Sequence, residues 1–425
     1  MANGQSEKEI YVYSHGEGMS DPVLMGTLSV SEVRGKEICS FTYEKDYLHL
    51  DAAFAMDPNL RLYEGPQYAP DTQSNFGIFL DSSPDRWGRV LMERREAVRA
   101  KAEDRPPARL MESDYLLGVH DASRMGALRF KTDPEGPFLD NDDRHATPPM
   151  TSLRALEHAS LELEGDDDFN SEQYKRNLAL LIAPGSSLGG ARPKASVQDP
   201  DGRLWIAKFP SRNDDVDQGA WEYVIYQLAC DCGITMAESQ AEVYYSDCHT
   251  FLTKRFDRTD AGGRLHFFSA MTLLGYQDGA DGSNGVSYLE LVDLLMQRGS
   301  EPETDLRQLW RRIVFNICVS NTDDHLRNHG FMLRDGGLRL SPAYDINPEP
   351  RGHGLNLNID EHNNALDLDL ALSVAKYFRL NEEEAQAIIE EVKTSVGNWR
   401  SVARSLGISK REISQMAPAF RFAGE

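Results

Sequence analysis

Residues Asn321 to Asp345 read N-T-D-D-H-L-R-N-H-G-F-M-L-R-D-G-G-L-R-L-S-P-A-Y-D. Before this stretch, Leu309 to Val319 is apolar at the spacing of a buried helix. After its polar opening, Gly330 to Leu333 and Leu338 to Leu340 are short apolar runs separated by Asp-Gly-Gly, which is a turn signal. The pattern therefore predicts a polar loop between a buried helix and a β-hairpin.

The polar positions of this stretch have the spacing of a phosphoryl-transfer site. Asn328 follows Asp323 by five positions, and Asp345 follows the predicted hairpin. Protein kinases use a loop aspartate to orient the attacking hydroxyl, and an asparagine and a second aspartate at such offsets to hold magnesium. Plain polar loops are also rich in Asp and Asn. The three positions together favour Asp323 as catalytic residue, with Asn328 and Asp345 as magnesium ligands.

The composition limits the class of protein. A chain of 425 residues can form two or three domains. Its 45 Lys and Arg against 68 Asp and Glu give a formal net charge of −23, which disfavours direct nucleic-acid binding through the bulk surface. The 5 cysteines are scattered without zinc-ligand spacing, as in a cytosolic protein. The polar N-terminus and short apolar runs predict a cytoplasmic chain without signal peptide or membrane span.

The order of the expected elements predicts an α+β chain in four parts. Residues 1–131 form a β-rich module with a helix that starts near Pro84, for which Ser83 is the expected N-cap. Residues 132–150, rich in Asp, Pro and Gly, are expected to be a linker. Residues 151–258 combine helices with two hairpins, and residues 259–425 are mostly helical around the polar loop.

A Gly- and Ser-rich stretch, Pro184 to Lys194, precedes the first of these hairpins. Glycines let backbone N–H groups approach phosphates closely, and Arg192 and Lys194 add positive charge. The stretch matches neither a Walker A motif nor the glycine loop of kinases, so an ordinary loop is the alternative. Lys208 follows in I-A-K-F, where kinases have their phosphate-binding strand lysine. A solvent-facing lysine is the alternative there.

Two further features follow the order of a kinase N-lobe. Glu222 lies on the next predicted helix and is the candidate ion-pair partner of Lys208, with an exposed helix glutamate as the alternative. The second hairpin ends in Lys254, Arg255 and Phe256. An adenine-binding hinge is expected there, with Phe256 packed on the purine, although buried aromatic residues more often belong to a core.

These motifs, in this order, make the chain similar to the HipA family of serine/threonine kinases, the toxin components of bacterial toxin–antitoxin pairs. The resemblance covers most of the chain and implies a two-lobed, protein-kinase-like fold with an N-terminal β-rich module and an α-helical C-terminal lobe. The motifs are P-D-R-W-G at 84–88, S-x-x-G-A-R-P-K at 187–194, I-A-K-F-P at 206–210, K-R-F-D-R at 254–258, N-T-D-D-H-L-R-N at 321–328 and A-Y-D at 343–345.

The resemblance also implies roles for single residues of an enzyme that uses ATP and Mg²⁺. Asp323 resembles the catalytic aspartate, and Ser187, or Ser186 beside it, resembles a loop serine that family members autophosphorylate. A phosphate there adds negative charge and would push the loop away from ATP. The implied nucleotide contacts are Gly189, Gly190, Ala191, Arg192, Pro193, Lys194, Lys208, Lys254, Arg255, Phe256, His325, Leu326, Arg327, Asn328, Tyr344 and Asp345.

The implied acceptor is a protein serine or threonine, on an aminoacyl-tRNA synthetase or another translation component, with growth arrest and persistence as the outcome. The implied partner is a small basic helix-turn-helix antitoxin, HipB-like, through which DNA is contacted indirectly. Two alternatives stay open. One is a kinase of a small molecule or lipid, because D-x-H-x-x-N also occurs in phosphoinositide and antibiotic kinases. The other is a catalytically silent corepressor, which the presence of Lys208, Asp323, Asn328 and Asp345 disfavours.

Overall fold

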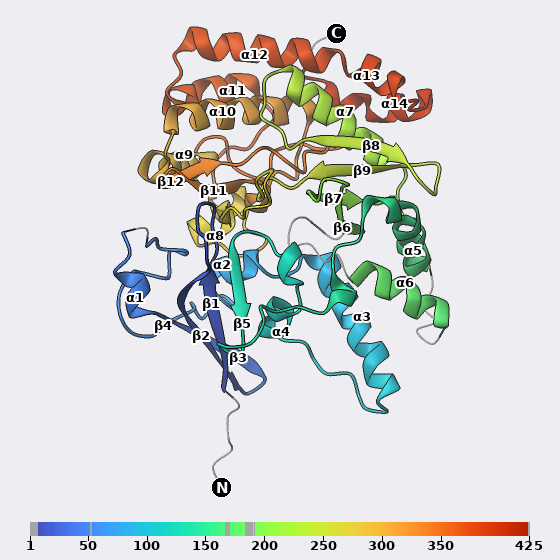
Figure 1. The fold of residues 1–425 in the computed structure, drawn as a ribbon. Coiled ribbons are helices and arrows are strands. Elements are labelled where there is room, and N and C mark those ends of the chain that lie inside the picture. Colours follow the sequence, from blue (N-terminus) through green and yellow to red (C-terminus); the bar gives the residue numbers. More distant parts are fainter. Residues whose placement is uncertain (1–6, 52, 166–170, 183–189, 191, 424–425) are drawn as a thin grey trace. The chain divides into compact units, whose positions relative to one another are not determined.

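The computed structural model describes residues 7–51, 53–165, 171–182, 190 and 192–423, and it divides into two compact units (Figure 1). The first unit comprises Met1–Arg212 and Asp257–Phe268, and the second comprises Asn213–Phe256 and Ser269–Glu425. The β-rich N-terminal part and the largely helical C-terminal part confirm the predicted α+β class. The four-part division with boundaries at 131, 150 and 258 stays a prediction.

The first unit begins with a five-stranded antiparallel sheet of order β4-β3-β2-β1-β5. Side chains alternate along its strands, so that Ile10, Val12 and Leu28 are fully buried while their neighbours are at least partly exposed. Burying one side chain in two gives the sheet a single apolar face. The strands are β1 (Glu7–Ser14), β2 (Val23–Val33), β3 (Lys36–Tyr43), β4 (Gln67–Tyr68) and β5 (Leu128–Lys131).

Helices and one hairpin complete the first unit. The helix α6 packs against both α3 and α5, and the hairpin of β6 and β7 turns at residues 199–203. These elements are α1 (Lys45–Leu48), α2 (Gly77–Asp81), α3 (Arg86–Ala102), α4 (Glu112–Leu117), η1 (Asp121–Ser123), η2 (Asp143–His145), η3 (Met150–Ser152), α5 (Leu153–Gly165), α6 (Glu172–Ile182), β6 (Lys194–Gln198) and β7 (Leu204–Lys208).

The predicted N-cap of α3 is wrong by two residues. Asp85, not Ser83, caps the helix, because its carboxylate accepts a hydrogen bond from the Gly88 N–H at 2.8 Å. The Ser83 hydroxyl instead donates to the Phe79 carbonyl oxygen at 2.8 Å, at the end of α2. Serine and aspartate can both cap a helix. Because the Ser83 hydroxyl is bonded to the Phe79 carbonyl oxygen, Asp85 is the residue that caps α3.

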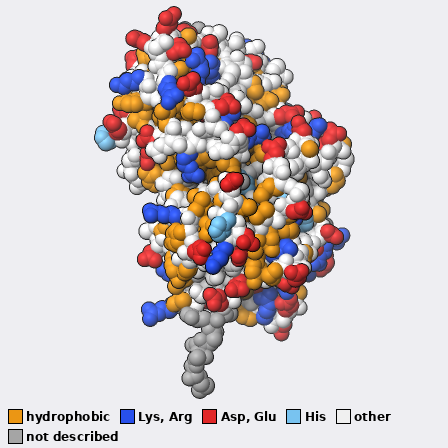
Figure 2. Space-filling model, turned by 60° about the vertical axis from the view of Figure 1, so that its left-hand side comes forward, with side chains coloured by type: hydrophobic (Ala, Val, Ile, Leu, Met, Phe, Trp, Pro, Cys, Tyr) orange, Lys and Arg blue, Asp and Glu red, His pale blue; other side chains and the backbone are white. Residues whose placement is uncertain are grey.

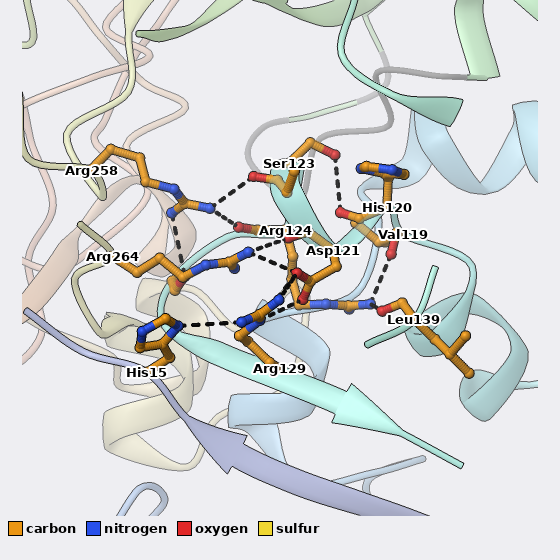
Figure 3. Close-up of polar contacts among 12 residues, drawn as sticks. His15, Val119, His120, Asp121, Ser123, Arg124, Arg129, Leu139, Arg258 and Arg264 are labelled. Carbon is orange, nitrogen blue, oxygen red and sulfur yellow. Dashed lines mark hydrogen bonds and ion pairs between the residues drawn. The ribbon is translucent and has the colours of Figure 1, made fainter. Parts of the chain in front are cut away.

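Arginines join the segment 257–268 to the rest of the first unit (Figure 3). The Arg264 guanidinium donates to the backbone oxygen of Asp121 at 2.7 Å, and Arg129 pairs with the Asp121 carboxylate at 2.6 Å. Arg258 donates to the backbone oxygen of Arg124 at 2.7 Å. The buried Arg124 donates in turn to four backbone carbonyl oxygens, those of Ser82, Leu116, Val119 and Leu139. It thus satisfies buried carbonyl groups at the end of α2, in α4 and in two further segments.

A buried histidine of the first unit lies close to this cluster in the sequence. His266 is buried, with 6% exposure, and its ring centroid lies 4.8 Å from that of Phe54. Its Nε2 lies 2.8 Å from the Ser14 hydroxyl. Burial lowers the pKa of His266 to about 4, so the ring is neutral at pH 7.

His266 should therefore make the first unit sensitive to mild acid. An unfolded histidine titrates near 6.5 and the folded one near 4, so its contribution is complete above pH 6.5 and is lost as the pH falls toward 4. Between pH 7 and pH 5 the wild type should lose about 2 kcal/mol more of its free energy of unfolding than His266→Gln. Urea titrations at both pH values measure this difference, and equal losses would contradict it.

The second unit is built around α10 (Pro302–Val319), in which every residue from Arg312 to Val319 is buried. It packs against α9, α11 and α12, and the rings of Trp399 and Phe420 stack with centroids 4.3 Å apart beside α7. Within the described ranges, no helix combines the length and the apolar character needed to cross a membrane. The other helices are α7 (Gln218–Asp231), α8 (Ala270–Leu274), η4 (Gly282–Asn284), α9 (Tyr288–Arg298), η5 (Leu326–Asn328), α11 (Leu368–Val374), η6 (Ala375–Phe378), α12 (Glu382–Gly397), α13 (Trp399–Ser405), α14 (Lys410–Met416) and η7 (Ala417–Phe420).

Two hairpins of the second unit confirm the predicted ones. The first pairs β8 (Ser239–Val243) with β9 (His249–Lys254), and the second pairs β11 (Gly330–Arg334) with β12 (Gly337–Leu340). A further short strand, β10 (Phe267–Ser269), bridges the unit boundary in the sequence. Asp335 and Gly336 have φ values of 52° and 76°. Two successive left-handed residues match the tight turn that the right-handed twist of a hairpin requires.

Candidate functional site

The predicted polar loop begins where α10 ends. Ser320 adopts a left-handed conformation with φ 51° and turns the chain out of the helix. Asp323 is exposed three residues later, whereas Asn321 and Asp324 on either side are buried. The loop therefore has fixed anchors and presents the predicted catalytic carboxylate to solvent, where a substrate hydroxyl can reach it.

Asn328 lies at the end of η5 and is held against the same loop. Its side-chain N–H group donates to the Asp323 backbone oxygen at 2.9 Å, which leaves the side-chain Oδ1 oxygen available to a cation. The His325 N–H donates to the Asp323 backbone oxygen and the Asn328 N–H to the His325 backbone oxygen, at 2.9 Å and 2.8 Å. The structure thus brings Asp323, His325 and Asn328 into one hydrogen-bonded turn.

Asp345 follows β12 and has φ 57°, which is the left-handed region that few residues other than glycine adopt. The preceding Tyr344 hydroxyl donates to the Arg327 backbone oxygen at 2.7 Å and so ties this segment to the polar loop. The Tyr344 ring lies 5.4 Å from the Phe256 ring. Asparagine and aspartate tolerate left-handed geometry better than other side chains, so Asp345 suits this position.

The remaining predicted residues of the loop differ in their surroundings. Leu326 is buried, and Arg327 lies 3.6 Å from the Asp278 carboxylate. The His325 Nδ1 atom is buried, and within the described ranges it has no hydrogen-bond partner. A buried polar atom in this state is costly unless a ligand or water satisfies it, which fits the predicted role of His325 near a nucleotide.

The Gly- and Ser-rich stretch is described in part. Ser186, Ser187, Gly189 and Ala191 lie outside the described residues. Gly190 is exposed, and Arg192 and Pro193 are half-buried and buried, respectively. Their contacts with phosphates stay predictions.

Lys194 is tied to α3 of the same unit. Its ammonium group lies 2.9 Å from the Asp85 carboxylate, and both side chains are 2% exposed. The same ammonium donates to the Gly190 backbone oxygen at 2.8 Å. Asp85 thus caps α3 with one oxygen and holds Lys194 with the other. The sequence prediction includes Lys194 but not Asp85, although P-D-R-W-G is among its motifs.

Lys208 and Glu222 are both buried, with 8% and 7% exposure. The alternatives of a solvent-facing lysine and an exposed helix glutamate are therefore wrong. Lys208 ends β7 and is the register partner of Lys194 on β6. Glu222 lies on α7 of the other unit, so the expected pairing of Lys208 with Glu222 stays a prediction.

The predicted hinge coincides with a unit boundary in the sequence, since Phe256 is the last residue of its segment. Lys254 ends β9, and its ammonium group lies 3.6 Å from the Glu238 carboxylate. Arg255 is buried with 3% exposure. A contact between these residues and adenine stays a prediction.

Residues 186–399, which are 214 of the 425 residues, match the model of the HipA-like C-terminal domain family. The chain belongs to this HipA-like family. The match includes the polar loop, Lys208, the predicted hinge and Asp345, so the family resemblance inferred from the motifs is confirmed.

Two individual relatives are distant in sequence. A candidate kinase, Y4mE, of Sinorhizobium fredii is 27% identical over 182 residues, which cover 38% of this chain and 41% of that protein. A candidate kinase of Haemophilus influenzae is 28% identical over 232 residues, which cover 48% of this chain and 67% of that protein. The chain thus spans less than half the length of the first relative.

A solved HipA chain has the same fold. It is HipA of Shewanella oneidensis in a toxin–antitoxin complex with HipB and operator DNA. The TM-score is 0.66 at 15% sequence identity, with 97% of this chain and 95% of that chain covered. The likeness confirms the predicted fold over nearly the whole length of both chains.

The candidate magnesium ligands of this HipA-like chain are few. Within the described part of the chain, no group of three or more His, Cys, Asp or Glu side chains is placed to hold a metal. The predicted pair consists of the Asn328 amide and the Asp345 carboxylate, both hard oxygen ligands. Such a pair fits Mg²⁺ when phosphates and water complete its octahedron, as is usual at kinase sites.

Sequence reasoning does not identify the residue that anchors the polar loop. Asp324 is buried, and its carboxylate accepts hydrogen bonds from Tyr288, Asn316 and His329. Burial raises the pKa of Asp324, but the His329 ring and the hydrogen bonds lower it further, so that the net shift is downward. The doubled aspartate in N-T-D-D-H is the sequence signal that could have indicated two separate roles.

Proposed function

We propose that this chain is an ATP-dependent serine/threonine protein kinase of the HipA type and the toxin of a toxin–antitoxin pair. The observation that best supports the proposal is the loop of the second unit, where an exposed Asp323 is joined to Asn328 by a hydrogen bond. Asp345 follows the adjacent hairpin, as the metal-binding aspartate does in kinases. This set meets the requirements of phosphoryl transfer better than those of a plain loop.

Each residue of the set has a distinct task in the proposed reaction. The Asp323 carboxylate orients the acceptor hydroxyl and takes its proton as the phosphoryl group is transferred. The Asn328 Oδ1 and the Asp345 carboxylate would hold Mg²⁺, which neutralises charge on the phosphates when bound. Positioning of the hydroxyl supplies much of the catalysis, because little covalent chemistry is left to the protein.

The nucleotide is proposed to lie against the remaining residues of the family motifs. Buried Lys208 places a cation at the end of β7, in keeping with a role on the phosphates, and Glu222 is its proposed partner. Phe256 is proposed to pack on adenine beside Tyr344. Ser187, or Ser186, is proposed to be the autophosphorylated residue that switches the kinase off.

The proposed acceptor is a protein serine or threonine, on an aminoacyl-tRNA synthetase or another translation component. The proposed partner is a small basic antitoxin of the HipB kind. On the face that Figure 2 shows, the described Lys and Arg side chains are scattered among Asp and Glu. With a net charge of −23, such a surface favours a basic protein over direct DNA contact.

Magnesium-dependent nucleotide binding tests this proposal. We expect the wild type to bind ATP with Mg²⁺ and to bind it about tenfold or more weakly after Asp345→Asn, because one negative ligand is lost. Asparagine keeps the left-handed geometry at φ 57°. Isothermal titration calorimetry with and without EDTA measures both effects, and Asp369→Ala, at an exposed helix residue, is the control. Equal affinities with and without Mg²⁺ would contradict the assignment of Asp345.

A further inference from the structure

A buried carboxylate lies directly beside the exposed one in the polar loop. Asp324 is 3% exposed, and one of its oxygens, Oδ2, accepts three hydrogen bonds. The donors are the Tyr288 hydroxyl at 2.5 Å, the Asn316 side-chain amide at 2.7 Å and the His329 Nε2 atom at 3.0 Å. Hydrogen bonds to an ionised acceptor are about twice as strong as neutral ones.

The three donors belong to three different elements of the second unit. Tyr288 is the first residue of α9, Asn316 lies in the last turns of α10, and His329 immediately precedes β11. All three are nearly inaccessible to solvent. The Tyr288 and His329 rings also pack edge to face at 5.7 Å. Asp324 is therefore held in place by residues at the start of α9, at the end of α10 and just before β11.

The same network continues toward Asp345. The Asn316 side-chain oxygen accepts a hydrogen bond from the Asn321 amide at 3.1 Å, and both residues are buried. The Asn321 side-chain oxygen faces the Asn347 N–H at 3.4 Å. The Asn347 amide lies 3.5 Å from the Asp345 Oδ1. Strong bonds hold the loop end of this network, and longer contacts extend it to the segment of the proposed metal ligand.

We propose that Asp324 is a positioning residue, whose buried carboxylate with Tyr288 and Asn316 locks the peptide that presents Asp323 to the acceptor hydroxyl. The inference rests on the proposed function, since it assigns Asp323 the catalytic role. Asp323 and Asp324 share one peptide unit, so fixing the second side chain limits the rotation of the first residue. The side-chain hydrogen bonds of Asn316 and Asn321 connect this peptide to the segment that contains Asp345.

The size of the effect follows from the geometry that phosphoryl transfer needs. A misplacement of 1 Å can lower a rate by about a hundredfold. When one of the three donors is lost, the Asp324 carboxylate keeps two partners. The loop should therefore be displaced by less than about 1 Å. We therefore expect the maximal rate to fall by about tenfold, while the apparent KM for ATP changes by less than about twofold.

The Tyr288→Phe variant tests this inference, because it removes one hydroxyl and keeps the ring that packs on His329. Tyr115→Phe is the matched control in the other unit, where a buried tyrosine hydroxyl donates to the Glu93 carboxylate at 2.7 Å. Asp324→Asn is the second variant, which keeps the shape of the side chain and removes its charge. Initial rates of label transfer from γ-labelled ATP to the chain, over a range of ATP concentrations, give the maximal rate and KM.

Hydrogen exchange of the loop gives a readout that does not need activity. The N–H groups of His325 and Asn328 close the loop onto Asp323 and onto His325, and both lie in one short peptide for mass spectrometry. We expect exchange in the peptide that contains 321–329 to be about tenfold faster in Tyr288→Phe and unchanged in Tyr115→Phe. A purely structural role would instead lower the thermal midpoint without a selective change in this peptide.

The outcomes separate the two proposals. Selective loop exchange with a lower maximal rate and an unchanged KM supports the positioning role. Wild-type exchange and rates in both Tyr288→Phe and Asp324→Asn would overturn it, and so would equal effects of Tyr115→Phe. If the wild type transfers no phosphoryl group, the proposed function fails, and loop exchange alone then decides whether Asp324 fixes the loop.

Discussion

Replacement of Asp323 by alanine is expected to lower phosphoryl transfer by about a thousandfold while leaving the fold intact. A positioned acid or base contributes roughly 10² to 10⁴ to a rate, and Asp323 also orients the acceptor hydroxyl. Its side chain is exposed and its backbone oxygen, not its carboxylate, anchors Asn328. The substitution therefore removes the reacting group and keeps the hydrogen bonds that the residue 323 backbone oxygen accepts from His325 and Asn328.

Single-turnover transfer from γ-labelled ATP, with circular dichroism for the fold, measures this effect. Asp369→Ala is the matched control, because Asp369 is another exposed aspartate of the same unit and lies in the first turn of α11. We expect wild-type rates from the control. A rate within about threefold of wild type in Asp323→Ala would show that another residue takes the proton of the hydroxyl.

Replacement of Asp85 by alanine is expected to lower the free energy of unfolding of the first unit by about 4 kcal/mol. The substitution leaves the Lys194 ammonium buried without its counter-charge, which costs about 3 to 5 kcal/mol in comparable pairs. It also removes the N-cap of α3, since the same carboxylate accepts the Gly88 N–H. Urea titration measures the loss.

A double variant distinguishes the buried pair from the cap. Adding Lys194→Met to Asp85→Ala removes the unpaired charge and should recover about half of the lost stability, because the missing N-cap remains. Asp201→Ala is the control, since Asp201 pairs with Arg203 at 3.0 Å on the exposed turn of the same unit. It should cost less than about 1 kcal/mol. Equal losses from Asp85→Ala and Asp201→Ala would contradict a stabilising buried pair.

Local sequence signals predict the elements around the polar loop well. The turn between β11 and β12 is predictable because Asp335 and Gly336 suit left-handed geometry, which their φ values of 52° and 76° show. The apolar spacing of α10 likewise predicts a buried helix that ends just before the loop. The N-cap of α3 is harder to predict, because Ser83 and Asp85 are both suitable N-cap residues. The hydrogen bond from the Ser83 hydroxyl to the Phe79 carbonyl oxygen decides between them.

Contacts between distant positions explain what the sequence cannot predict about the candidate site. The offsets of Asp323, Asn328 and Asp345 are readable because they lie within one short segment. Asp85 and Lys194 are 109 positions apart, and Tyr288 and Asp324 are 36 apart. No local sequence pattern indicates that the members of either pair are in contact. Their partnership follows from how α3 meets β6 and how α9 meets the loop, which packing determines.

The burial of Lys208 and Glu222 illustrates the same limit. Both residue types are exposed in most proteins, so composition and spacing alone leave the solvent-facing alternative open for each. The structure buries both, which requires compensation of their charges. Lys208 lies in the family motif I-A-K-F-P at 206–210, and Glu222 is its proposed partner. The burial of both residues therefore supports the proposal that Lys208 serves a nucleotide.

The most direct test of the central claim is transfer of label from γ-labelled ATP to the purified chain, with Mg²⁺ or EDTA and with Asp323→Ala in parallel. Mass spectrometry first establishes that the starting protein is unphosphorylated, and phosphopeptide mapping locates the label. We predict Mg²⁺-dependent label in the peptide of residues 184–194 of the wild type and none in the variant. Absence of label from the wild type, or equal label in Asp323→Ala, would contradict the claim that this loop catalyses phosphoryl transfer to the chain's own serine.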